Sequence, residues 1–124
     1  MGNMMENKSG SEDAGSEMKA RLRADLRAAM KDKRTLEAKV IRALIAALDN
    51  AEAPPGQPAQ QHGFHDGSAE VARLLLNGTR VDEIVQAEIA EREHAAHEME
   101  RLQMPDHAEV LRAEALIIRR YAER

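Results

Sequence analysis

Apolar side chains recur at every third or fourth position along most of this chain, which is the spacing that gathers them on one face of an α-helix. The most apolar stripe is widened by Ile41 and Ile45 until it covers nearly half of the helix circumference. Its main positions are Leu36, Val40, Leu44 and Leu48. We expect this helix to lie at the centre of the fold.

Three further segments have the same helical spacing. They are marked by Met18, Leu22, Leu26 and Met30, by Val81, Ile84, Val85, Ile89, Ala96, Met99 and Leu102, and by Leu111, Ala115, Ile118 and Tyr121. The chain has one Phe, one Tyr and no Trp, so its core is aliphatic, which suits helix packing better than a sheet sandwich. A break near residues 32–35 separates the first two helices, and Pro105 separates the last two. The sequence predicts an all-α fold, a small helical bundle of about four helices with a C-terminal antiparallel helix hairpin.

Local signals set the expected ends of these helices. A short helical piece is expected at 68–75, with Gly78 suited to a helix end. Thr79 with Asp82 three residues later resembles a capping box, which would start the third long helix. Asp106 is expected to cap the last helix.

The beginning and the middle of the chain differ from the rest in composition. Residues 1–17 are mostly Gly, Ser, Asn, Asp and Glu, and such a segment buries too little apolar area to offset its ordering entropy. We therefore expect a disordered tail at 1–17 and a single helical domain at 18–124. Proline and glycine crowd residues 53–67, which predicts a long mobile loop inside that domain.

The composition also excludes several classes of site. The absence of cysteine rules out disulfide frameworks, thiolate zinc sites and cysteine nucleophiles. Residues 1–17 contain no apolar run of the kind found in signal peptides, and no later segment approaches the length and apolarity of a membrane span. We expect a cytoplasmic chain without membrane contact, since an exported protein would need a leader that has already been removed.

Four segments, taken in order, resemble the GatB/YqeY-like family. They are residues 18–30, 41–52, 84–92 and 111–121, which read MKARLRADLRAAM, IRALIAALDNAE, IVQAEIAER and LRAEALIIRRY. The resemblance implies a helical domain related to the tail of the B subunit of the tRNA-dependent amidotransferase, a tail that engages tRNA. It also implies a link to carbon–nitrogen ligase activity with glutamine as the amido donor.

The chain departs from that family pattern in two places. It stops at Arg124, where longer relatives continue into a second helical domain. It also carries Gln103 where relatives often have the glycine that ends the third helix. The second domain bears on tRNA binding, because part of the tRNA-binding surface is expected to lie there.

Basic residues concentrate in one stretch of the domain. Residues 18–42 contain nine basic and three acidic side chains, a local charge of +6 on a chain whose total is −4. Two interpretations are open: a solvated face that attracts the acidic third helix across the bundle, or a basic stripe that contacts tRNA phosphates. Helical spacing places Arg23, Arg27 and Lys31 in a row with one side chain per turn, and Arg34 extends it if the helix continues. These four residues are the candidate nucleic-acid-binding site. With no aromatic residues among them, reading of the RNA sequence by base stacking is not expected.

Two histidine clusters have the residue types of metal sites. His94 and His97 lie three apart on the third long helix, with Glu91 three residues before them, whereas His62 and His65 lie in the proline-rich segment. No second Glu-x-x-His motif supplies ligands from a facing helix, so we expect no metal and no other cofactor.

Catalytic motifs are equally absent from the sequence. There is no glycine-rich phosphate loop, no Gly-x-Ser-x-Gly elbow and no nucleophile with a plausible base, so we expect no independent enzymatic activity and no catalytic residues. The sequence favours an accessory domain that binds tRNA or a protein assembly. The competing function is a protein–protein adaptor unrelated to tRNA.

Overall fold

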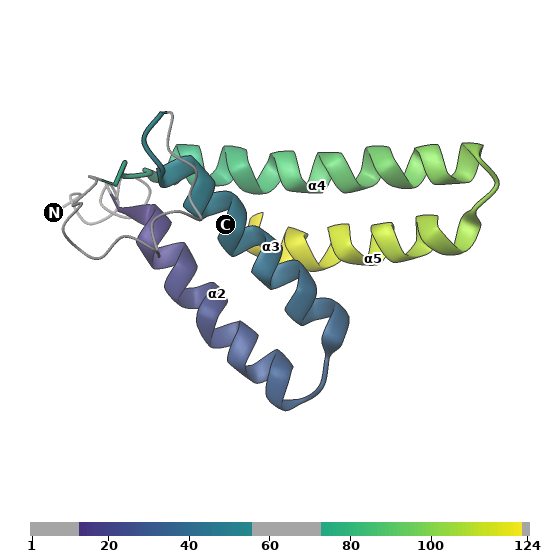
Figure 1. Ribbon diagram of the computed structural model, residues 1–124, viewed down its shortest axis with the longest axis horizontal. Coiled ribbons are helices and arrows are strands. Elements are labelled where there is room, and N and C mark those ends of the chain that lie inside the picture. The colour runs from purple at the N-terminus through teal and green to yellow at the C-terminus, as the bar shows by residue number, and fades with distance from the viewer. Residues whose placement is uncertain (1–12, 56–72, 123–124) are drawn as a thin grey trace, which may run out of the picture.

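Four helices make up the part of the chain that the computed structural model describes, residues 13–55 and 73–122 (Figure 1). They are α2 (Ala14–Lys31), α3 (Thr35–Glu52), α4 (Gly78–Arg101) and α5 (Pro105–Ala122). No strand occurs within these two ranges. The all-α prediction is confirmed, and the two predicted breaks lie where consecutive helices are separated.

The helices form two antiparallel hairpins, α2–α3 and α4–α5 (Figure 1). α3 crosses the second hairpin obliquely and packs against α5, so it lies between α2 and that hairpin. The turn between α4 and α5 lies far from α2 and α3, so the closed end of the second hairpin projects from the bundle. The small bundle with a C-terminal antiparallel hairpin is therefore confirmed.

The turn of the α2–α3 hairpin is defined by two backbone hydrogen bonds. Asp32 is the C-cap of α2, and the next residue, Lys33, has a φ of 57°, in the left-handed region. The Lys33 N–H donates to the Met30 carbonyl at 3.1 Å, and the Arg34 N–H donates to the Ala29 carbonyl at 2.8 Å. This pair of bonds is a Schellman motif, which satisfies carbonyls that a helix end otherwise leaves unpaired.

The α4–α5 hairpin repeats the same turn. Gln103 has a φ of 59°, and its N–H donates to the Glu100 carbonyl at 3.0 Å. The Met104 N–H donates to the Met99 carbonyl at 2.8 Å. Pro105 follows as the first residue of α5, where its fixed φ and missing N–H are tolerated. Both hairpins therefore hold a non-glycine residue in a conformation that glycine adopts more easily.

The core is aliphatic and centres on α3. The largest side chains removed from solvent are Leu22, Val40, Ile41, Leu44, Leu48, Val85 and Ile118. Leu44 lies in the middle of the α3 stripe and is only 1% exposed. Ile45 is partly buried against the same cluster, so the wide apolar face predicted for this helix is confirmed.

The apolar stripe expected on α2 is confirmed only in part. Leu22 is buried and Leu26 packs against the core, but Met30 is 53% exposed and Ala29 is buried instead. The reason is geometric, because four residues turn a helix by more than one revolution. A strict four-residue spacing drifts by about 40° per step, or about 120° from Met18 to Met30, which carries the last position off the buried face.

α2 begins earlier than the sequence indicates. Asp13 is its N-cap, and the Asp13 carboxylate accepts the Ser16 N–H at 3.3 Å. Residues 14–17, which the sequence assigns to a disordered tail at 1–17, therefore belong to the helix. The tail residues before Asp13 lie outside the described part of the chain.

The proline-rich segment is described only at its edges. Of the loop expected at 53–67, residues 53–55 follow α3 without helical structure, and the others lie outside the described ranges. The short helical piece expected at 68–75 is not found in its described part, because residues 73–77 are non-helical.

Asn77, rather than Thr79, caps α4. The Asn77 side chain accepts the Arg80 N–H at 2.8 Å, and Gly78 is the first helical residue instead of the end of a preceding helix. Asparagine is as effective an N-cap as serine or aspartate. The Asn77-Gly78 pair, which resembles a turn signal in the sequence, therefore begins helix α4. Asp106 lies in the first turn of α5 rather than at its cap.

A buried ion pair joins the start of α2 to the end of α3. Lys19 Nζ lies 2.6 Å from Glu52 Oε1 and 2.8 Å from Asp49 Oδ1. The second carboxylate oxygen, Glu52 Oε2, has no hydrogen-bond partner among the described residues and lies 3.7 Å from Arg73 Nη1. Gly15 covers this oxygen so closely that a Cβ added there would lie 2.7 Å from it. The ion pair therefore holds together α2, α3 and the residues that lead into α4.

Candidate nucleic-acid interface

Three of the four predicted site residues form a row on α2. Arg23, Arg27 and Lys31 are exposed and follow one another at four-residue intervals. Each interval advances about 6 Å along the helix. Leu22 and Ala29 are buried on another side of α2, and the row turns by about 80° from Arg23 to Lys31, so Lys31 faces away from the bundle and Arg23 lies at its flank. We call Arg23, Arg27 and Lys31 the α2 basic row.

The α2 basic row forms no ion pair with a carboxylate among the described residues. The acids nearest to it in the sequence have other partners. Asp25 Oδ2 accepts the Tyr121 hydroxyl at 2.5 Å. Asp32 and Glu37 bind Arg34, at 3.3 Å and 2.8 Å. Within the described residues, the positive charge of the row is therefore not neutralised by a carboxylate.

Arg34, the fourth predicted site residue, does not extend the row. α2 ends at Lys31, and Arg34 is the N-cap residue of α3, on the far side of the turn. Its guanidinium binds Glu37 and Asp32, and the hydrogen bond to Glu37 raises the pKa of Arg34 above its ordinary value. The Schellman bonds end α2 before Arg34. Arg34 therefore forms ion pairs within the α2–α3 turn and is not part of the α2 basic row.

Two other cations lie near the C-terminal end of the α2 basic row. Lys33 is exposed in the turn. Arg42 of α3 reaches back to α2, where its Nη2 lies 3.4 Å from the Met30 sulfur. Neither forms an ion pair within residues 13–55 and 73–122. The proximity of Arg42 is a tertiary contact between α3 and α2, which spacing along one helix does not predict.

Five of the seven acidic side chains of α4 form ion pairs within the second hairpin. Glu98 binds Arg101 of the same helix at 2.9 Å, and Glu100 binds Arg112 of α5 at 2.7 Å. The hydrogen bonds from these arginines lower the pKa values of both carboxyls. In the described part of the chain, no ion pair joins α4 to α2. The predicted attraction between a basic face and the acidic third helix is therefore not made through direct contacts here.

A second buried carboxylate, that of Glu114, forms ion pairs with cations of two other helices. Glu114 of α5 is 5% exposed, and its two oxygens bind Arg92 of α4 at 3.2 Å and Lys39 of α3 at 3.3 Å. Lys39 belongs to the basic stretch, and although its side chain is largely exposed, its ammonium pairs with this carboxylate. The +6 stretch thus divides into cations that hold the bundle together and cations that face solvent.

Tyr121 is not available to stack on a nucleotide base. Its ring is buried, its hydroxyl donates to Asp25, and the Arg21 guanidinium lies over the ring at 4.6 Å from the centroid. Burial and the hydrogen bond to Asp25 raise the pKa of Tyr121. Phe64, the single phenylalanine, lies outside the described residues. Among the described residues, no aromatic ring is therefore exposed for base stacking.

The histidines on α4 are separate from the basic row. His94 and His97 are both exposed. No group of three or more His, Asp or Glu side chains able to hold a metal ion occurs within the described ranges. His62 and His65 lie outside them.

Comparisons of the chain with protein-family models, curated proteins and solved structures give no match. No described helix combines the length and apolarity needed to cross a lipid bilayer. The resemblance to the GatB/YqeY-like family therefore rests on the four segments quoted above, and the geometry of the α2 basic row has to carry the argument for function.

Proposed function

We propose that this chain is an accessory helical domain that binds the phosphate backbone of tRNA through the α2 basic row. One observation carries the proposal: three exposed cations succeed one another at one-turn intervals with no carboxylate bound to them among the described residues. Lys19 and Arg34, in contrast, are bound to carboxylates of the same chain.

The dimensions of the row suit a short stretch of nucleic-acid backbone. Arg23 and Lys31 are eight residues apart, which corresponds to about 12 Å along α2. A strand of duplex DNA carries one phosphate per roughly 3.4 Å of its axis, so a row of this length would match about three phosphates of a comparable backbone. Phosphate contacts of this kind position a protein on RNA without reading its sequence.

The resemblance to the GatB/YqeY-like family supports tRNA as the RNA that is bound, in the cytoplasm where tRNA is used. Within that proposal, carbon–nitrogen ligase activity with glutamine as amido donor belongs to a partner enzyme, and this chain contributes RNA contact.

The test is a titration of fluorescently labelled tRNA with the chain, in which fluorescence anisotropy measures binding. With three phosphates neutralised, we expect log K to fall with log salt at a slope of about −2.7 between about 50 and 200 mM salt. Reversing the α2 basic row to glutamate should abolish the binding. These side chains lie away from the core, so the triple variant should retain its helical circular dichroism.

A matched control separates the row from net charge. It reverses three exposed arginines on the second hairpin and changes the total charge by the same amount: Arg80→Glu, Arg101→Glu and Arg112→Glu. The control should bind tRNA nearly as well as the wild type. Equal loss in both triple variants, or no tRNA binding by the wild type at low salt, would overturn the proposal. The alternative function is then a protein–protein adaptor unrelated to tRNA.

A further inference from the structure

α5 has two apolar faces, although a helix at the edge of a bundle needs only one. The first is buried and contains Ala108, Ala115, Ile118 and Tyr121. Away from that face, Leu116 is 67% exposed, and Val110, about 120° around the helix from Leu116, is 47% exposed. Leu116 is the most exposed large apolar side chain among the described residues. Exposed apolar side chains that gather in a patch are typical of a contact surface.

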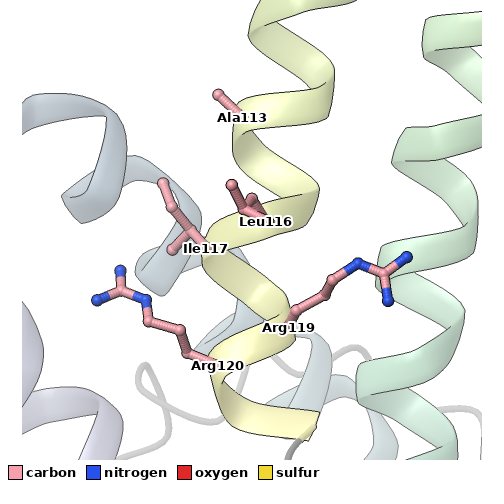
Figure 2. A pocket seen from close by; sticks show the side chains of 5 residues that line it. All are labelled: Ala113, Leu116, Ile117, Arg119 and Arg120. Atoms are coloured by element: carbon pink, nitrogen blue, oxygen red, sulfur yellow. The ribbon is translucent and has the colours of Figure 1, made fainter.

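The residues of this second face have the spacing of a coiled-coil seam. We call them the α5 outer face: Asp106, Glu109, Val110, Ala113, Leu116, Ile117 and Arg120, of which Ile117 is also partly buried against the core. An open cavity of about 740 Å³ lies over the C-terminal part of this face (Figure 2). Its lining includes Ala113, Leu116, Ile117 and Arg120, which are related as i, i+3, i+4 and i+7. Four residues with that relation form the hole that receives one side chain of a partner helix.

Charge is ordered along the α5 outer face. Asp106 and Glu109 lie at its N-terminal end and form no ion pair among the described residues. Arg120 lies at its C-terminal end, where it binds Glu37 of α3 at 3.0 Å while its side chain stays half exposed. The face therefore runs from acidic through apolar to basic. When two copies of the face lie antiparallel, the acidic end of each lies against the basic end of the other.

We infer that the α5 outer face binds a second copy of this chain, with the two α5 helices antiparallel across a two-fold axis near Ala113. In that arrangement Asp106 of one copy faces Arg120 of the other, and this pair occurs twice by symmetry. Val110 of each copy enters the hole of its partner, while the small side chain of Ala113 lets the two helices approach closely at the axis. A single helix of another protein would have to reproduce the same order of charge in reverse, whereas a second copy does so by symmetry.

The size of the surface sets the expected strength of the dimer. Residues 106–120 span about 21 Å of helix, and one such helix pair buries less than the roughly 800 Å² per partner of a standard stable interface. We therefore expect a reversible dimer with a dissociation constant on the order of 100 μM. The inference does not depend on tRNA binding, because the α2 basic row lies on a different helix.

The first experiment measures the mass of the full chain by sedimentation equilibrium up to about 1 mM. The wild type should shift from monomer to dimer over that range. Leu116→Glu places a charge in the centre of the apolar contact and should weaken the dimer by about tenfold or more. Leu102 is 55% exposed in the turn between α4 and α5, so Leu102→Glu is the matched control and should leave the dimer unchanged. A wild type that remains monomeric at about 1 mM, or equal effects of both substitutions, would overturn the inference.

A charge exchange then tests the antiparallel register. Asp106→Lys alone sets lysine against Arg120, and Arg120→Glu alone sets glutamate against Asp106, so each variant by itself should be monomeric. Mixed together, the two variants present only opposite charges at both ends of the contact and should form a heterodimer. Because Arg120→Glu also removes the bond to Glu37, circular dichroism of each variant must first show a folded helical chain. Folded variants that fail to associate when mixed would contradict the register.

Discussion

Replacing Lys19 with methionine should destabilise the fold by about 3 kcal/mol, because it leaves a buried carboxylate without its counter-ion. Lys19 Nζ lies 2.6 Å from Glu52 Oε1, and the Glu52 side chain is only 3% exposed. Methionine keeps the length of the lysine stem, so the cost arises mainly from the charge. The value lies at the lower end of the range for breaking a buried pair, because Arg73 remains 3.7 Å from Glu52 Oε2.

The complementary substitution should cost less. Glu52→Gln leaves the Lys19 ammonium with Asp49, which is 2.8 Å away and partly exposed to water, so we expect a loss of about 1–2 kcal/mol. The double variant removes both buried charges at once. Its loss should therefore be smaller than the sum of the two single losses by about 2 kcal/mol.

These free energies of unfolding are measured by urea denaturation followed by far-ultraviolet circular dichroism. Arg80→Met is the control, because Arg80 and Glu83 form an exposed i,i+3 pair at 3.4 Å, for which a loss below about 1 kcal/mol is expected. A loss below about 1 kcal/mol for Lys19→Met, or strictly additive losses in the double variant, would show that the pair does not support the fold as argued.

Three other predictions follow from single positions. Leu44→Ala should cost about 2–5 kcal/mol in the same denaturation assay, since Leu44 is buried in the middle of α3, and a loss below about 0.5 kcal/mol would contradict its place in the core. Gln103→Gly should stabilise the chain by about 0.5–1 kcal/mol, because the left-handed φ costs more for glutamine than the added unfolded-state entropy costs for glycine; an unchanged urea midpoint would refute this. Burial and the hydrogen bond to Asp25 raise the pKa of Tyr121. The protonated phenol therefore contributes fully to the free energy of unfolding below about pH 10, and this contribution is lost as the pH rises through the pKa of the folded state. Its phenolate absorbance should therefore appear together with alkaline unfolding, and Tyr121→Phe should flatten the loss of stability above about pH 10; a phenol that ionises near its ordinary pKa in the folded chain would contradict the buried bond.

Local periodicity was enough to predict the helices that matter most for the core. The apolar residues of α3 occur at both three- and four-residue intervals. They therefore stay on one side of the helix along its whole length, and the predicted stripe is buried. The strict four-residue spacing on α2 lacks this correction, and Met30 falls outside the core. The turns were predicted from interrupted periodicity, but the left-handed residues Lys33 and Gln103 carry no glycine to mark them.

Features that depend on tertiary contacts were not predictable from the same patterns. Residues near Asp13 have the composition of a tail, and their order comes from a cap together with the bond from the Gly15 N–H to the Leu76 carbonyl. Burial of Glu52 requires that α2 and the residues before α4 close over the end of α3. On α5, Leu116 belongs to no predicted stripe, because a sequence pattern identifies an apolar face but not whether a second one is left uncovered.

The candidate site shows the same division. Helical geometry alone places the α2 basic row on one side of α2, and the structure agrees with that arrangement. Which cations stay unpaired depends on the fold: Lys39 pairs with Glu114 of α5, and Arg34 is bound in the turn. Five of the seven acids of α4 pair with arginines of α4 and α5, because these two helices form one hairpin.

The position of each residue in the row decides which of them reports most directly on RNA binding. Lys31 lies in the last turn of α2, where a cation stabilises the helix dipole by about 0.3–1 kcal/mol, so its charge has a role in the fold even without a ligand. Arg23 lies in the middle of the helix, where the dipole has little effect, and it forms no ion pair among the described residues. Selection for stability alone therefore accounts for Lys31 but leaves the charge of Arg23 unexplained. Arg23→Glu is consequently the single substitution that separates the two roles, since loss of tRNA binding without loss of stability follows only if the row serves an external anion.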